Sequence, residues 1–98
     1  MKETFGEYIR QKRRKKDVTL IIAAAELGIS TSQLHYIERG KANEIVRPKM
    51  DILKKLAAYY GLPEDEVVIK GGRIPTDIYF KIVNNLELLN VIKNYEVK

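Results

Sequence analysis

The sequence has no cysteine and no tryptophan, few prolines and a single histidine. Because cysteine is absent, disulfides and thiolate metal sites are excluded, which fits a protein of a reducing cytosol. The longest apolar run, residues 20–25, is far shorter than the roughly 20 residues that cross a bilayer. The first residues are charged and no apolar stretch follows them, so we expect no signal peptide, no membrane association and a cytoplasmic location.

Side chains for catalysis and metal binding are also sparse. His35 is the only histidine, and since one imidazole makes a poor metal site, we expect it to face solvent or a backbone. The acids Glu64, Asp65 and Glu66 fall in the predicted first turn of a helix, where they complement the helix dipole. No nucleophile, base and oxyanion donor form an arrangement for catalysis. We therefore expect no enzymatic activity, no cofactor, no metal and no small-molecule ligand.

Basic charge is present, and it is unevenly distributed. Residues 1–49 carry eleven Lys or Arg and six acids, a balance of +5, whereas residues 50–98 carry seven of each, a balance of zero. This asymmetry predicts a polyanionic partner for the first half, although a solvated charged face would look the same. The cluster at residues 12–16 also suits the negative end of a helix dipole.

Apolar spacing predicts helices throughout, and no segment alternates as a strand would. The chain is therefore predicted to be all-α, with one compact domain over residues 1–70 and a helical tail over residues 71–98. A hinge is expected at Gly71 and Gly72, and the tail would be one helix or two joined near Asn84 and Asn85. The five helices of the domain are expected at residues 4–16, Leu20–Leu27, 31–39, 49–60 and 64–69.

The segment between Gly28 and Gly40 is the most informative part of the chain. It contains a glycine turn, a short capped helix and a glycine stop. Thr19 and Ser30 are predicted N-caps, and Ser30 with Gln33 has the form of a capping box. Gly28 is expected to have a positive φ, which glycine adopts without a steric penalty.

Two helices joined by that turn form a predicted helix-turn-helix. Ala24 is small where the two helices should cross, and it allows their axes to approach. The predicted buried positions are Ala23, Leu27, Ile29, Leu34 and Ile37. The second helix would then present small polar groups and an aromatic ring, which suits reading base edges in a DNA major groove. The alternative is an ordinary pair of core helices.

Residues 4–69 resemble the Cro/phage-repressor type of helix-turn-helix family, also called the Xre family. The most specific part of the resemblance is Ile29-Ser30, followed by Ile37-Glu38-Arg39-Gly40-Lys41. Further matches are Phe5-Gly6 with Ile9-Arg10, Pro48 with Leu53, Leu56-Ala57 and Gly61-Leu62, and Asp65-Glu66-Val67-Val68. The resemblance implies a repressor-like, five-helix DNA-binding domain that dimerises on double-stranded DNA as a transcriptional regulator.

The resemblance also implies roles for single residues. The base-reading positions are Thr31, Ser32, Gln33 and Tyr36. Arg13 and Glu38 match a pair in which a buried arginine holds the end of the third helix and leans toward a phosphate, although Glu38 would otherwise be a solvated helix-end acid. Gly28 and Ala24 support the turn. The positions expected at the DNA backbone are Arg13, Thr19, His35, Arg39, Lys41, Asn43 and Arg47.

Two departures from the family pattern affect how the domain would dock. Leu20 stands where the family usually has a glutamine that meets the phosphate backbone. The loop between Gly40 and Pro48 is about four residues longer than usual. Its Lys41, Asn43 and Arg47 would supply replacement backbone contacts, or its Ile45 and Val46 would pack on a partner chain.

The tail carries more apolar positions than one buried stripe needs. We expect it to pack partly on the first and fifth helices and partly on a second copy, giving a homodimer; the alternative is an intramolecular cover. The positions expected in this packing are Ile78, Ile82, Leu86, Leu89 and Ile92. Because no separate activating domain is visible, a repressor is expected. The alternative function is an antitoxin-like module whose tail and loop bind a partner protein, with DNA binding secondary.

Overall fold

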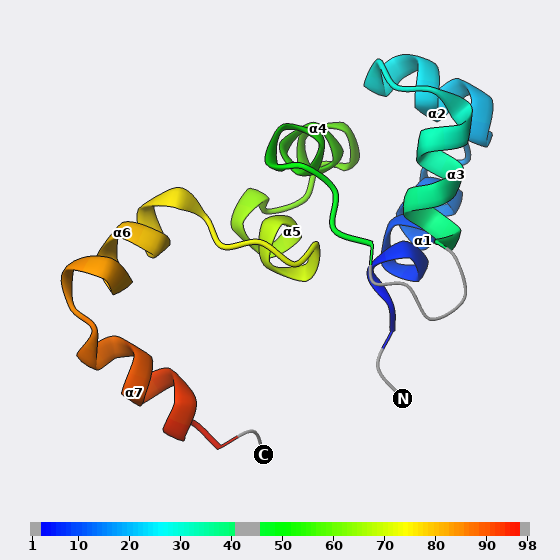
Figure 1. Cartoon of the computed structure of the whole chain (residues 1–98). Coiled ribbons are helices and arrows are strands. Elements are labelled where there is room, and N and C mark those ends of the chain that lie inside the picture. Colours follow the sequence, from blue (N-terminus) through cyan, green and yellow to red (C-terminus); the bar gives the residue numbers. More distant parts are fainter. Residues whose placement is uncertain (1–2, 41–45, 97–98) are drawn as a thin grey trace.

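The computed structural model describes residues 3–40 and 46–96. Within those ranges the chain forms helices and no strand, which confirms the all-α prediction (Figure 1). In these described ranges five helices form the body and two more form the tail, so the structure has seven helices where the predicted domain has five. The helices are α1 (Phe5–Lys16), α2 (Leu20–Leu27), α3 (Thr31–Arg39), α4 (Met50–Tyr60), α5 (Glu64–Lys70), α6 (Thr76–Asn84) and α7 (Glu87–Asn94).

The helix boundaries follow from local capping. The Thr19 and Ser30 side chains accept hydrogen bonds from the backbone N–H groups of Ile22 (3.2 Å) and Gln33 (3.0 Å), as predicted. Gly28 ends α2 with a φ of 73°, also as predicted. In the part of the chain that is described, the Gln33 side chain does not return a bond to Ser30, so only half of the capping box forms.

A single apolar core lies among the first five helices. Its fully buried side chains are Ile9, Leu34, Leu53, Leu56, Val67 and Val68. Ala23 and Ala24 of α2 are buried, and α2 packs against α3 and α4. The placement of Ala24 at the crossing of α2 and α3 stays a prediction. Ile29 is only partly buried, because it lies in the turn and packs at the margin of the core.

A second close approach, between α1 and α3, depends on Gly6. A Cβ at this position would overlap the carbonyl oxygen of Glu38 and lie 2.8 Å from that of Ile37. Since both neighbours are backbone atoms at the end of α3, neither can move without shifting the helix. Gly6 therefore sets how closely the first helix supports the third.

We expect Gly6→Ala to destabilise the fold by about 3 kcal/mol or more, the upper range for overpacking, because the clash is with backbone. The free energy of unfolding in urea measures this. Gln11→Ala, an exposed change on the same helix, is the matched control and should shift it by less than about 0.5 kcal/mol. Equal stability of the two variants would contradict the proposed close approach.

The tail extends away from the body (Figure 1). No residue of α6 or α7 is buried; Ile78 and Ile82 are half-buried, and Leu86, Leu89 and Ile92 are exposed. Among the described residues, the tail therefore does not pack extensively on α1 or α5, although Thr76 and Asp77 at the start of α6 lie beside Val68 of α5. The connection after α5 directs the tail away from the body (Figure 1). Of the helices described, none is long and apolar enough to span a membrane.

The glycine pair at the start of that connection lies against side chains of the body. Gly71 is buried, and a Cβ there would overlap the Leu53 side chain. Gly72 is exposed with a φ of 88°, and a Cβ there would lie 2.8 Å from Cγ of Arg47. Both glycines thus allow a close approach, and the expected hinge stays a prediction.

Candidate DNA-binding surface

Helix α3 buries one side and presents the other to solvent. Leu34, Ile37 and Glu38 are buried. The outward positions are Thr31, Ser32, Gln33 and His35, which are exposed, and Tyr36, which is half-exposed. These are the positions predicted to read bases, together with His35, and the structure places them on one short helix that the tail leaves open (Figure 1).

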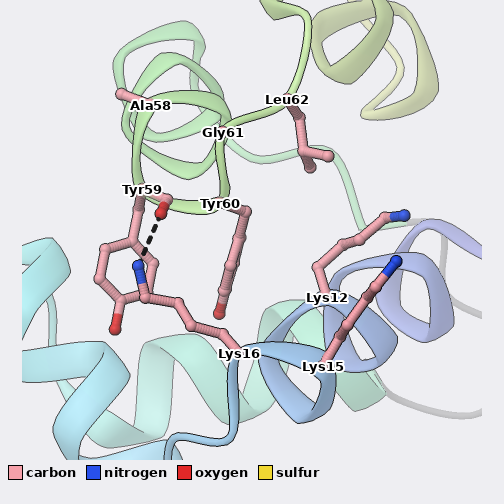
Figure 2. Close-up of a pocket in the computed structure, with 8 residues that line it drawn as sticks. All are labelled: Lys12, Lys15, Lys16, Ala58, Tyr59, Tyr60, Gly61 and Leu62. Atoms are coloured by element: carbon pink, nitrogen blue, oxygen red, sulfur yellow. Dashed lines mark hydrogen bonds between the residues drawn. The ribbon is translucent and has the colours of Figure 1, made fainter.

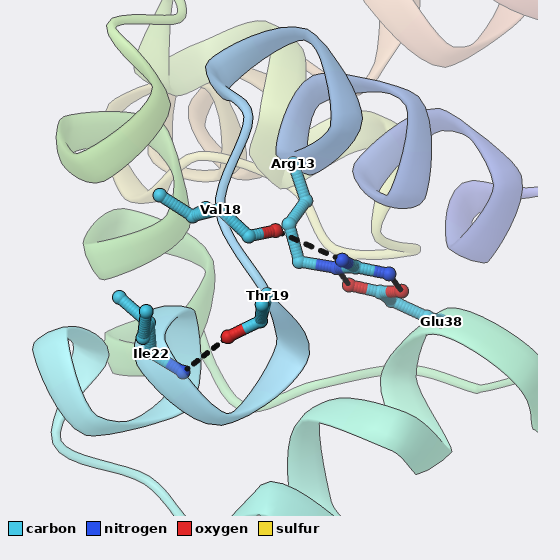
Figure 3. Close-up of polar contacts among 5 residues, drawn as sticks. All are labelled: Arg13, Val18, Thr19, Ile22 and Glu38. Atoms are coloured by element: carbon cyan, nitrogen blue, oxygen red, sulfur yellow. Dashed lines mark hydrogen bonds and ion pairs between the residues drawn. The ribbon is translucent and has the colours of Figure 1, made fainter.

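The end of α3 is held by an ion pair with α1 (Figure 3). Arg13 Nε donates to Glu38 Oε2 at 2.8 Å, and Nη2 donates to Oε1 at 3.0 Å. Only 4% of Glu38 is exposed, so the alternative of a solvated acid is wrong. A bidentate guanidinium–carboxylate contact fixes both direction and distance, so it orients the two helices relative to each other.

Arg13 also holds the start of α2. Its Nη1 donates to the carbonyl oxygen of Val18 at 3.0 Å, one residue before the Thr19 cap (Figure 3). Its hydrogen bonds to Glu38 raise the pKa of Arg13, with burial acting in the opposite direction. With 15% of its side chain exposed, Arg13 is first a brace between helices. Three of its five N–H donors are engaged, so two remain, and the lean toward a phosphate stays a prediction.

We expect Glu38→Ala to destabilise the fold by about 3 kcal/mol, because it leaves a largely buried guanidinium without its partner. Urea unfolding measures the loss. The exposed pair of Lys70 and Glu66 provides a matched control, and Glu66→Ala should cost about 0.5 kcal/mol or less. If the two substitutions cost the same, the Arg13–Glu38 contact does not brace the domain.

Of the residues predicted to contact the DNA backbone, the structure describes some and leaves others outside the described ranges. Thr19 is exposed at the start of α2, and Arg39 is exposed at the end of α3. Arg47 is exposed as well, although its stem packs against Gly72. Lys41 and Asn43 lie outside the described residues, as does Ile45. Val46 is half-buried beside the body.

A groove of about 590 Å³ lies between α3 and the start of α4. Gln33 and Tyr36 line one side, and Arg47 and Lys49 line the other. Lys49 is the N-cap of α4 and makes no capping bond with its side chain. Lys49 was not among the residues predicted to contact DNA, although a lysine directly before a helix start adds positive charge beside N–H groups that favour anions.

A second hollow, of about 580 Å³, lies between the basic end of α1 and the end of α4, and Lys12, Lys15 and Lys16 line it (Figure 2). Lys16 Nζ donates to the Tyr59 carbonyl oxygen at 3.0 Å and lies 4.0 Å from the ring centroid. The Tyr59 hydroxyl donates to Glu26 at 2.7 Å, and burial followed by this bond raises the pKa of Tyr59 to about 12. Burial also raises the pKa of Tyr60. Lys16 therefore stabilises the end of α4, whereas Lys12 and Lys15 extend away from Tyr59.

Metal binding finds no support in residues 3–40 and 46–96. These residues contain no group of three His, Cys, Asp or Glu side chains that could hold an ion. His35 is exposed, as expected for a single imidazole on the outer side of α3.

A family model described as a helix-turn-helix domain matches residues 4–68. The chain therefore belongs to the helix-turn-helix family, and the resemblance to Xre-type DNA-binding proteins is confirmed.

Two curated relatives come from Bacillus subtilis (strain 168). The uncharacterized HTH-type transcriptional regulator RghRB is 34% identical over 70 residues, 71% of this chain and 48% of that protein. The HTH-type transcriptional repressor RghR is 33% identical over 72 residues, 74% of this chain and 51% of that protein. The chain thus spans about half the length of these relatives.

A solved complex of the SinR and SinI proteins contains a structure similar to this one. The TM-score is 0.56 at 24% sequence identity, and the match covers 86% of this chain and 79% of the other. This likeness concerns the fold alone. The structural match covers 86% of this chain, whereas the family model matches residues 4–68.

Proposed function

We propose that this protein is a transcriptional regulator that binds double-stranded DNA sequence-specifically and reads the major groove with α3. The observation that carries the proposal is the outer face of α3, where Thr31, Ser32 and Gln33 are exposed on a helix whose other side is buried. The Arg13–Glu38 pair fixes that helix to the body. A rigid helix with outward polar groups matches the geometry of groove readers.

Affinity and specificity would come from different groups. Cations near α3, such as Arg39, Arg47 and Lys49, would contact phosphates and give affinity without sequence information. Gln33 would pair with an adenine edge, and Tyr36 would lie against a thymine methyl group. Because half of the capping box is not formed, the Gln33 amide is not held by its own helix start. Thr31 and Ser32 would discriminate less, since a hydroxyl both donates and accepts.

We expect Gln33→Ala and Tyr36→Ala each to reduce the preference for the operator over random duplex about tenfold, the loss of one good base contact. Affinity for random duplex should change little, because phosphate contacts remain. Competition binding at several salt concentrations, on an operator selected from random DNA, measures both quantities.

Gln11→Ala, which removes an exposed amide from α1, is the matched control and should leave the preference unchanged. If both α3 variants kept the full sequence preference, α3 would not be the reading helix. Weak salt dependence of operator binding by the purified protein would also count against a DNA-binding function.

The proposed repressor acts as a homodimer held by its tail. One helix-turn-helix reads one half-site, and specific binding normally needs two half-sites about one helical turn apart. Leu86, which directly precedes α7, and Leu89 and Ile92 on α7 expose 63%, 41% and 58% of their surfaces. An apolar face of this kind gains free energy when it is buried, and a second copy offers the same face. The name of RghR supports repression as the outcome.

We expect Leu89→Asp to convert the dimer into a monomer, because it places a carboxylate within the apolar face of α7. Sedimentation equilibrium of the full chain measures the mass. Asn90→Asp introduces the same charge at the neighbouring position and should leave the dimer intact. An unchanged dimer for Leu89→Asp would place the interface elsewhere.

A second candidate is a tail that binds a different protein. The same exposed face favours it, and the structural neighbour was solved as a SinR–SinI complex. An antitoxin-like function would belong to this candidate. Sequence-specific DNA binding by a monomeric wild-type protein would favour it over the homodimer.

A further inference from the structure

The connection between body and tail is fixed by an arginine that no part of the proposed function uses. Arg73 Nε donates to the Pro48 carbonyl oxygen at 2.6 Å, and Nη2 reaches the Arg47 carbonyl oxygen at 3.4 Å. The Arg73 backbone N–H also donates to Val68 at the end of α5, at 3.0 Å. The residue where the chain leaves the body is therefore bound both to α5 and to the segment that precedes α4.

The two residues before Arg73 are packed against the body as well. Gly71 fits against Leu53 of α4, and Gly72 fits under the stem of Arg47. Arg47 and Arg73 thus interlock, since one lays its aliphatic stem over the connection and the other donates to the backbone beside that stem. With three consecutive residues held, the first part of the connection has little freedom to rotate.

The segment that Arg73 holds is adjacent to the reading helix. Arg47 and Pro48 line the groove that Gln33 and Tyr36 line from the other side. Pro48 is buried, so its carbonyl is a fixed point of the body and not a surface atom that adapts to Arg73. The direction in which the chain leaves for α6 is consequently set relative to α3.

We propose that Arg73 is a positioning residue for operator recognition, and that it sets the half-site spacing that the dimer accepts. This inference rests on the proposed function, in which the tails join two copies. If tails form the only interface, the distance and rotation between the two reading helices depend on how rigidly each tail is joined to its body. Two extra base pairs between the half-sites rotate one half-site by about 70° around the duplex. If the connection between body and tail is rigid, the second reading helix cannot rotate by the same angle and does not reach its half-site.

The test measures spacing preference directly, with the full chain and synthetic operators. Two identical half-sites are placed at centre-to-centre distances that vary in single base pairs around one helical turn. For the wild type we expect binding to fall about 100-fold when the best spacing is changed by two base pairs, because simultaneous engagement is lost. For Arg73→Ala we expect a fall of less than about tenfold, because a loosened connection still reaches both half-sites.

Three further variants separate position from charge. Arg73→Lys keeps the positive charge but not the planar fork, so it should broaden the spacing preference as the alanine variant does. Lys55→Ala removes one charge from an exposed site on α4 and should keep the wild-type profile. Arg73→Gln keeps a long polar side chain but removes the charge and the planar fork, and it too should broaden the spacing preference. It provides a second measurement if the alanine variant does not fold. Binding to a single half-site serves as the internal control and should be unchanged in all variants.

The outcomes distinguish this inference from the function on which it rests. A wild type without spacing preference, or without sequence-specific binding, would refute the proposed tail-joined dimer. A wild type with a narrow preference that Arg73→Ala and Arg73→Gln retain in full would overturn the role of Arg73 alone. A lysine variant with the wild-type profile would show that charge, not position, is what matters, and would overturn it too.

Discussion

One contact organises the DNA-binding half of this protein, the guanidinium of Arg13 between Glu38 and Val18. It joins the last turn of α1 to the end of α3 and to the segment just before α2 through three hydrogen bonds of 2.8–3.0 Å. Apolar packing alone is non-directional and would hold α3 against the core without fixing its rotation. The planar fork adds direction, and a helix that reads base edges needs a fixed rotation to present the same side chains each time.

Close packing of backbones makes that contact possible. Gly6 lets α1 approach the carbonyl groups of Ile37 and Glu38. The glycines after α5 serve the same purpose, since Gly71 meets Leu53 and Gly72 meets Arg47. Gly6, Gly71 and Gly72 therefore lie where two parts of the body approach closely, whereas Gly28 and Gly61 end helices in open space.

Local rules were sufficient to predict much of the fold and the outer face of α3. Caps at Thr19 and Ser30 and the positive φ of Gly28 depend on residues within a few positions of one another, and sequence shows such patterns directly. The bonds from Arg73 to Pro48 join residues 25 positions apart, and a single sequence carries no signal for them. Glycines at 71 and 72 are equally typical of a hinge and of close packing, so the sequence alone does not decide between the two. The position of Lys49 at the groove beside α3 was not predicted, because a single lysine belongs to no recognisable sequence motif.

For the tail, prediction from the sequence is limited in a different way. Its periodicity reveals an apolar face but not what covers that face, and the structure of one chain leaves α6 and α7 without a buried residue. Exposed apolar surface on two consecutive short helices is unfavourable in water, so a covering partner would stabilise them. The charge distribution makes the division clear, because the basic excess lies in the half that holds α3 and the neutral half holds the tail. The basic excess and the exposed apolar face thus lie at opposite ends of the chain, and the segment from Gly71 to Arg73 joins the two parts.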